Sequence, residues 1–202
     1  MASNILGIDD HYLKWPKNTW GGTDLNNPDM INPWLEMQEI INPKKVIEIG
    51  MFAGHASLVM MNVFKNLESL ESYDPSDVSA SNARQIQKYY SKFKFYKEPI
   101  WGNEHRHSDI DLIFVDGHHL YDNPRKDLES CMKIKPRYIL ADNIELNDVR
   151  HALKVINKMF DIKYDPKYYF YTNEKYSSEQ RYMARSPGIM GLFKMEGNYD
   201  NI

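Results

Sequence analysis

The sequence predicts an α/β fold: a doubly wound, mainly parallel sheet with helices on both faces. Short apolar segments alternate with segments of helical periodicity, and this alternation favours parallel strands joined by helices. A turn with two glycines follows the first apolar segment. Acidic or amide residues stand at the ends of four strands, where open α/β sheets bind their ligands. We expect seven strands, the last two forming a C-terminal antiparallel hairpin.

The chain is expected to begin with an irregular N-terminal arm, residues 1–32, in which Trp, Pro, Gly and Asn are frequent. Strands are expected at residues 45–50, 70–74, 93–96, 111–116, 138–142, 162–171 and 189–195. Helices are expected at residues 33–41, 55–64, 78–93, 123–132 and 147–159, the first starting with a first-turn proline. The polar segment 172–187 is long for a hairpin loop, so we expect it to be functional or mobile.

Composition narrows the class of protein. The 202 residues suit a single domain spanning 1–202, and 42% hydrophobic with 26% charged residues is typical of a folded globular chain. A net charge of −3 with mixed signs disfavours a nucleic-acid partner. The single cysteine, Cys131, fits a reducing, cytoplasmic compartment. No signal peptide and no membrane span are predicted.

The glycine turn is the first candidate binding element. Gly50 and Gly54 allow the backbone to come close to a ligand, and Asp74 lies twenty residues past Gly54 at the end of the next strand. A carboxylate there suits the ribose hydroxyls of an adenosine-containing cofactor. The phosphate fingerprint G-x-G-x-x-G is missing, which disfavours NAD and a nicotinamide-dependent oxidoreductase. Alternatively, the glycines only make a tight turn and Asp74 caps a helix.

Five segments carry a resemblance to a known family. Residues 46–54 (VIEIGMFAG), 71–75 (ESYDP), 113–121 (IFVDGHHLY), 125–128 (RKDL) and 139–143 (ILADN) resemble class I S-adenosylmethionine (SAM)-dependent methyltransferases. Within that class they resemble the cation-dependent O-methyltransferases, both the catechol type and the small sugar-modifying type. The resemblance implies a Rossmann-like fold, SAM as cofactor, and a small hydroxylated molecule, a sugar or a catechol-like ring, as methyl acceptor.

The same resemblance implies a set of cofactor-binding residues. The glycine loop contacts the methionine portion of SAM, and the acid after the second strand holds the ribose. Trp101 is a candidate for stacking on the adenine, although a lone Trp is more often part of the core or its rim. The catechol type has Ser where this sequence has Ala56, which puts the carboxylate contact of Ser57 in doubt. The implied set is Glu48, Gly50, Phe52, Gly54, Ser57, Asp74, Trp101 and Asp116.

A magnesium site is implied by three residues that match the ligands of the catechol type: Asp116, Asp142 and Asn143. Two carboxylates and an amide oxygen are hard ligands that suit Mg²⁺. Alternatively, Asp116 and Asp142 only cap loops. His119 is the candidate catalytic base beside Asp116, because an imidazole accepts a proton near neutral pH. His118 could exchange roles with it.

Other functions remain open at this stage. The chain could be a methyltransferase that needs no metal, or a non-catalytic binding module that keeps the fold. The arm and the 172–187 segment could form a lid, and they suit a homodimer contact equally well. The identity of the acceptor cannot be read from the sequence, since acceptor pockets are built from variable loops.

Overall fold

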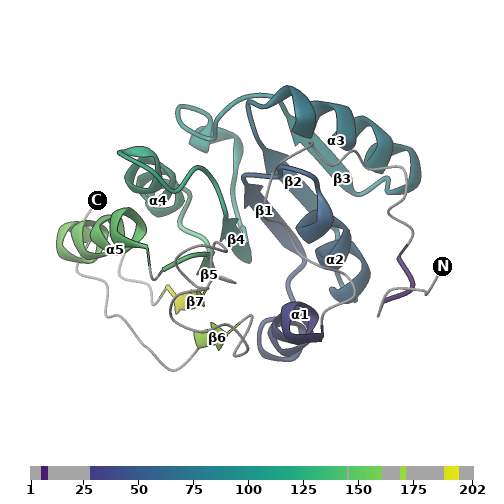
Figure 1. Ribbon diagram of the computed structural model, residues 1–202, viewed down its shortest axis with the longest axis horizontal. Helices are drawn as coiled ribbons and strands as arrows, with labels where there is room; N and C mark the ends of the chain where they lie inside the picture. The colour runs from purple at the N-terminus through teal and green to yellow at the C-terminus, as the bar shows by residue number, and fades with distance from the viewer. Residues whose placement is uncertain (1–5, 9–27, 145, 161–168, 172–188, 196–202) are drawn as a thin grey trace, which may run out of the picture.

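A computed structural model describes residues 6–8, 28–144, 146–160, 169–171 and 189–195. Seven strands form one sheet in the order β3-β2-β1-β4-β5-β7-β6 (Figure 1). Strands β1 to β5 are parallel, and β7 runs antiparallel to both β5 and β6. This confirms the predicted fold class. The bounds are β1 Lys45–Ile49, β2 Ser69–Tyr73, β3 Phe93–Tyr96, β4 Leu112–Val115, β5 Tyr138–Ala141, β6 Tyr169–Tyr171 and β7 Ile189–Lys194.

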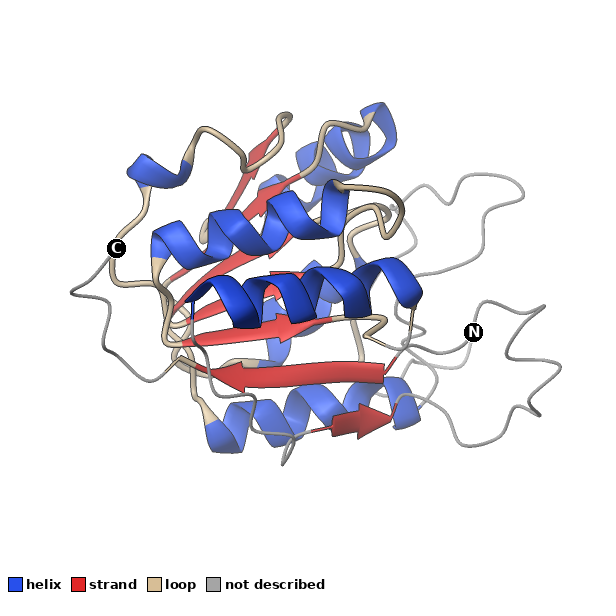
Figure 2. Ribbon diagram, turned by 90° about the vertical axis from the view of Figure 1, so that its left-hand side faces the viewer, coloured by secondary structure: helices blue, strands red, loops and turns tan. Residues whose placement is uncertain are grey.

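Helices cover both faces of the sheet, as Figure 2 shows from the side. They are α1 Pro28–Ile40, α2 His55–Val63, α3 Asp77–Tyr89, α4 Asn123–Ile134 and α5 Asn147–Phe160, with a short 3-10 helix η1 at Glu104–Arg106. Helices α1, α2 and α3 enclose one hydrophobic cluster, and α4 and α5 enclose the other. None of the helices in the described part of the chain is both long and apolar enough to cross a bilayer.

The strands are buried on both faces, which explains why they read as nearly continuous apolar runs. In β1, Val46 belongs to the cluster under α1 and α2, whereas Ile47 and Ile49 belong to the cluster under α4 and α5. Glu48 points to the same face as Val46, because side chains alternate along a strand. An acidic side chain therefore lies in the interior, directly before the glycine turn.

The first helix is longer than predicted. It begins at Pro28 and not at residue 33, so residues 28–32 are helical and Pro33 lies inside the helix. Proline removes one helical hydrogen bond. Ile31, Trp34 and Met37 are nevertheless spaced by three residues and are all buried, so packing against the sheet outweighs that loss.

Other boundaries also differ from the predictions. Helix α3 ends at Tyr89, not at residue 93, because the backbone at Tyr90 is already extended and Phe93 begins β3. Of the predicted strand 162–171, only Tyr169–Tyr171 lies in the described part. Residues 1–5 and 9–27 of the arm and the 172–187 segment also lie outside the described residues.

Candidate functional site

The carboxyl ends of β1 and β4 touch at the point where strand order reverses. Gly50 follows β1 with a φ of 87°, and a Cβ built on it would lie 2.1 Å from the backbone oxygen of Asp116. Glycine is therefore required at this position by the chain itself, independently of any ligand. The contact brings the glycine turn directly against the residue that follows β4.

Asp74, at the end of β2, organises the glycine turn. Its Oδ2 accepts hydrogen bonds from the backbone N–H groups of Met51 and Phe52, both at 3.0 Å. Its Oδ1 accepts from the N–H of Ser76, which caps α3, at 2.8 Å. A carboxylate has about four acceptor positions, so one remains for a ligand. The predicted ribose contact stays a prediction, and the helix cap of α3 is Ser76 rather than Asp74.

Glu48 and Ser57 lie behind the turn, fully buried. The Ser57 hydroxyl donates to Oε2 of Glu48 at 2.6 Å, and Oε1 has no hydrogen-bond partner among the described residues. Burial raises the pKa of Glu48 to about 8, opposed by the Ser57 hydrogen bond and assisted by the charges of Asp116 and Asp74. Glu48 is therefore mostly protonated at neutral pH. Direct contact of either side chain with the cofactor stays a prediction.

The two remaining members of the predicted turn, Phe52 and Gly54, also have positive φ values of 47° and 88°. The N–H of Gly54 donates to the carbonyl of Met51 at 2.9 Å. A Cβ on Gly54 would lie within 3 Å of the ends of the Met51 and Ile86 side chains. The turn is thus tightly packed on its inner side.

Asp116, His119 and Asp142 meet at the ends of β4 and β5. Each can offer one ligand atom so that the three atoms lie within 4.8 Å of one another, and His119 Nε2 is 3.3 Å from Asp116 Oδ1. Burial raises the pKa of Asp116 to about 7, the hydrogen bond with Asp142 opposes this rise, and the charge of Asp74 adds to it. Two ionised carboxylates this close repel one another, so a shared proton or a cation between them would be stabilising.

These three side chains would suit a metal ion. Carboxylate oxygens are preferred by Mg²⁺, and an added imidazole widens the choice to Mn²⁺, Fe²⁺ or Zn²⁺. The structure thus joins two of the predicted ligands to His119, which the sequence assigned as a base. Asn143, the third predicted ligand, follows Asp142 in a left-handed conformation with a φ of 54° and is partly buried.

Trp101, in the segment after β3, is held by Asp127, a residue to which the sequence assigned no role in the site. Its Nε1 donates to Oδ1 of Asp127 at 2.7 Å, and the Lys126 ammonium lies 4.8 Å from the ring centroid. Burial raises the pKa of Asp127 to about 6, whereas the Trp101 hydrogen bond and the charge of His119 lower it. The available signal was an acidic residue on the inner face of α4, four residues before the buried Cys131.

Asp127 also lines a pocket between the ends of β4 and β5 and the starts of α4 and α5. Its lining combines predicted site residues with apolar residues: Val115, Gly117, His118, His119, Pro124, Asp127, Leu128, Ala141, Asp142 and Val149. His118 differs from His119 in that its Nδ1 lies 3.1 Å from the side-chain amide of Asn123.

Comparisons with known proteins agree with this arrangement. Residues 47–138 match a family model described as a methyltransferase domain. No protein of curated function matches the chain. Similar solved structures include cofactor-bound Rv0187 from MTB, with a TM-score of 0.69, 12% identity, and coverage of 97% of this chain and 94% of that one.

Two further structures are similar, both with S-adenosylhomocysteine (SAH) bound. The O-methyltransferase of Bacillus cereus has a TM-score of 0.61 and 12% identity, covering 86% of this chain and 84% of that one. The Podospora anserina methyltransferase PaMTH1 has a TM-score of 0.57 and 16% identity, covering 84% and 82%.

The matched region, residues 47–138, is a methyltransferase domain. The strand order and the glycine turn agree with this match, and the fold is that of class I, SAM-dependent methyltransferases, as the sequence resemblance implied. Structures of O-methyltransferases are among those that share this fold.

Proposed function

We propose that this methyltransferase transfers the SAM methyl group to a hydroxyl of a small molecule, a sugar or a catechol-like ring, with the help of a divalent cation. The observation that carries the proposal is the cluster of Asp116, His119 and Asp142 beside the glycine turn. It combines hard oxygen ligands with a proton acceptor at the edge of the sheet where the fold binds ligands.

The cofactor would lie along the ends of β1 and β2. The turn from Gly50 to Gly54 would face the methionine portion, and the free acceptor position of Asp74 would take a ribose hydroxyl. Trp101 would form the wall beside the adenine. Glu48 and Ser57 would act from behind, by holding the inner side of the turn.

The cation would be held by Asp116, Asp142 and Asn143. When bound, a divalent cation lowers the pKa of an acceptor hydroxyl and orients it toward the methyl group. The chain supports this assignment because the two carboxylates already lie close together and would repel one another when both are ionised.

His119 would take the proton. The imidazole would accept the hydroxyl proton while the oxygen bonds to the methyl carbon, and the electrons of the broken C–S bond would remain on sulfur, so that SAH would be the product. His119 is favoured over His118 because it lies beside Asp116, whereas the His118 ring contacts Asn123. If His119 ligates the metal instead, another group must accept the proton.

Calorimetry with SAH, followed by methyl-transfer assays, tests the proposal. We expect SAH to bind, and activity on hydroxylated acceptors to disappear with EDTA and return with Mg²⁺. Asp142→Asn should lower the metal-dependent rate by about 100-fold, with SAH affinity retained. A protein without SAH binding would contradict the cofactor assignment. Activity that survives both EDTA and Asp142→Asn would identify a metal-independent methyltransferase instead. SAH binding without any turnover would identify a non-catalytic binding module.

A further inference from the structure

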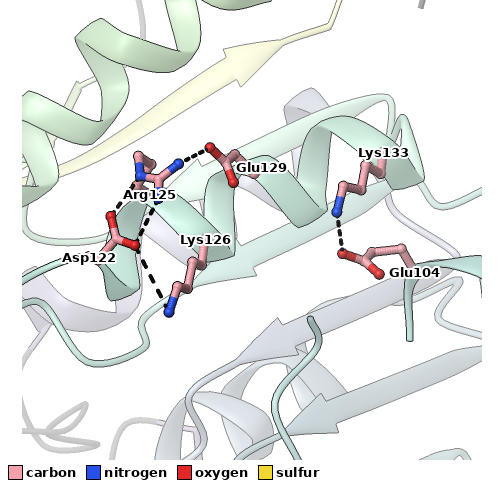
Figure 3. Close-up of polar contacts among 6 residues, drawn as sticks. All are labelled: Glu104, Asp122, Arg125, Lys126, Glu129 and Lys133. Atoms are coloured by element: carbon pink, nitrogen blue, oxygen red, sulfur yellow. Dashed lines mark hydrogen bonds and ion pairs between the residues drawn. The ribbon is translucent and has the colours of Figure 1, made fainter. Parts of the chain in front are cut away.

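The buried carboxylate of Asp127 is the feature that the proposed reaction does not use. Asp127 lies on the inner face of α4 and is only 4% exposed. The charged side chains that Figure 3 shows around α4 pair with one another: Arg125 with Asp122 and Glu129, Lys126 with Asp122, and Lys133 with Glu104 of η1. Asp127 instead faces the loops around the site.

One oxygen of Asp127 holds the segment that follows β3. Oδ1 accepts the Trp101 indole N–H at 2.7 Å, and Lys126 lies over the face of the same ring. A hydrogen bond to an ionised carboxylate is stronger than one between neutral groups. The position of the Trp101 ring is thus set by α4 and not only by its own segment.

The other oxygen packs against the turn that follows β4. A Cβ built on Gly117 would lie 2.6 Å from Oδ2 of Asp127, so any side chain at position 117 would push the two apart. Gly117 stands between Asp116 and the two histidines. A single carboxylate therefore contacts the segment with Trp101 and the turn with Asp116 and His119.

Stability alone gives little reason for a carboxylate here. Burying an acidic group has a desolvation cost, and apolar replacements of buried charges are often neutral or stabilising. Leu128 and Cys131, its neighbours on the inner face of α4, are apolar and almost fully buried. The contacts of Asp127 with Trp101 and Gly117 therefore explain the carboxylate at this position better than core packing does.

We propose that Asp127 is a positioning residue for methyl transfer: its Oδ1 fixes Trp101 through a hydrogen bond, and its Oδ2 packs against Gly117 in the turn that leads to His119. The adenine wall and the reacting groups are thereby held at a constant separation. This inference rests on the proposed function.

A double-mutant cycle tests the positioning role of Asp127. Calorimetry measures SAH affinity, and kcat and KM for SAM are measured separately. Asp127→Ala should weaken SAH binding by about tenfold or more, because the Trp101 indole N–H loses a charged acceptor, and it should also lower kcat. Asp127→Asn should restore most of the affinity, because the amide oxygen can still accept the indole N–H. Trp101→Phe keeps an aromatic face but loses the indole N–H donor, so it should weaken SAH binding. When Trp101→Phe is added to Asp127→Ala, SAH affinity should fall little further.

Glu129→Gln is the matched control, since Glu129 lies on the same helix and, in the described part of the chain, forms its ion pair with Arg125 (Figure 3). It should leave SAH affinity and kcat unchanged. The proposal is overturned if Asp127→Ala binds SAH like the wild type, or if its effect and that of Trp101→Phe simply multiply. Should Asp127→Ala not fold, unchanged SAH affinity in Trp101→Phe overturns it instead. A wild-type protein that binds no SAH would contradict the proposed function, not this role of Asp127 alone.

Discussion

At the scale of single residues, the acidic side chains around the site have different surroundings. Glu48 is fully buried beside a serine, whereas Asp74 is surrounded by backbone N–H groups. Asp116 lies at the edge beside His119 and Asp142. Burial favours the neutral form of a carboxyl group, and hydrogen-bond donors favour the charged form. Acidic side chains at neighbouring strand ends therefore differ in how strongly their surroundings favour the charged or the neutral form.

Glu48 predicts a pH dependence of stability. Its pKa is about 8 in the folded protein against 4.5 as the ordinary value, so between these pH values the unfolded chain loses a proton that the folded chain keeps. The free energy of unfolding therefore falls as pH rises from 4.5 to 8, by at most about 1.4 kcal/mol per pH unit, and the contribution is constant outside this window.

Glu48→Gln should remove this contribution, so the variant should gain stability relative to the wild type between pH 5 and pH 8, on the order of a few kcal/mol. Urea unfolding at both pH values measures the difference. Glu39→Gln, at an exposed carboxylate, is the control and should follow the wild type. Parallel curves for the wild type and Glu48→Gln would show that Glu48 ionises normally in the fold.

Gly50 predicts a large mutational effect that glycine conformation alone does not explain. Gly50 and Gly102 have similar φ values, 87° and 83°, but a Cβ on Gly102 would meet nothing within 4 Å. Gly102→Ala should cost about 1 to 2 kcal/mol through backbone strain. Gly50→Ala should cost at least about 2 kcal/mol more, or prevent folding, because its Cβ would overlap the Asp116 backbone. Thermal unfolding of the two variants tests this, and equal losses would contradict it.

At the scale of elements, α4 has two faces with different roles. Its outer face carries the ion pairs of Asp122, Arg125 and Glu129 and is joined to η1 through Lys133 and Glu104 (Figure 3). Its inner face places Leu128 in the core and Asp127 against the loops of the site. The helix thus contacts the site with its inner face, while its ion pairs lie on the partly exposed face.

We predict that the inner face determines how firmly α4 is attached. Leu128→Ala should destabilise the protein by about 2 to 5 kcal/mol, because it leaves a cavity at a side chain that is almost fully buried. Arg125→Ala should cost less than about 1 kcal/mol, since exposed ion pairs are screened by water. Chemical denaturation distinguishes them. A larger loss for Arg125→Ala would mean that the outer network holds the helix.

At the scale of the whole molecule, one sheet separates two hydrophobic clusters, and every central strand contributes side chains to both. The two clusters share β1, β4 and β5, so neither can lose its packing without disturbing the other. This arrangement supports a single domain over residues 1–202, which remains a prediction from the sequence.

A single cooperative unit should unfold in one calorimetric transition. We expect the calorimetric and van't Hoff enthalpies to agree, with about 0.7 kcal/mol for each residue, or about 140 kcal/mol near 60 °C. Differential scanning calorimetry of the full chain tests this. Two resolved transitions, or a van't Hoff enthalpy well below the calorimetric one, would show that part of the chain unfolds independently.

The sequence by itself determined the succession of strands and helices along the chain, which follows from local periodicity and from Gly and Pro punctuation, and both depend only on neighbours in the chain. It also carried the motifs that resemble SAM-dependent methyltransferases, and it predicted the strand ends as the place for the chemistry. The start of α1 was predicted wrongly because Pro33 favours a first turn locally, whereas buried contacts of Ile31 and Trp34 extend the helix.

Only the tertiary structure decided which residues meet. It placed His119 within reach of both Asp116 and Asp142, turned Asp127 of α4 toward Trp101, and pressed Gly50 against the Asp116 backbone. Such contacts join residues on different strands and helices, and they depend on strand order and helix packing. No local pattern carries that information, because the same spacing along the chain is compatible with many separations in space.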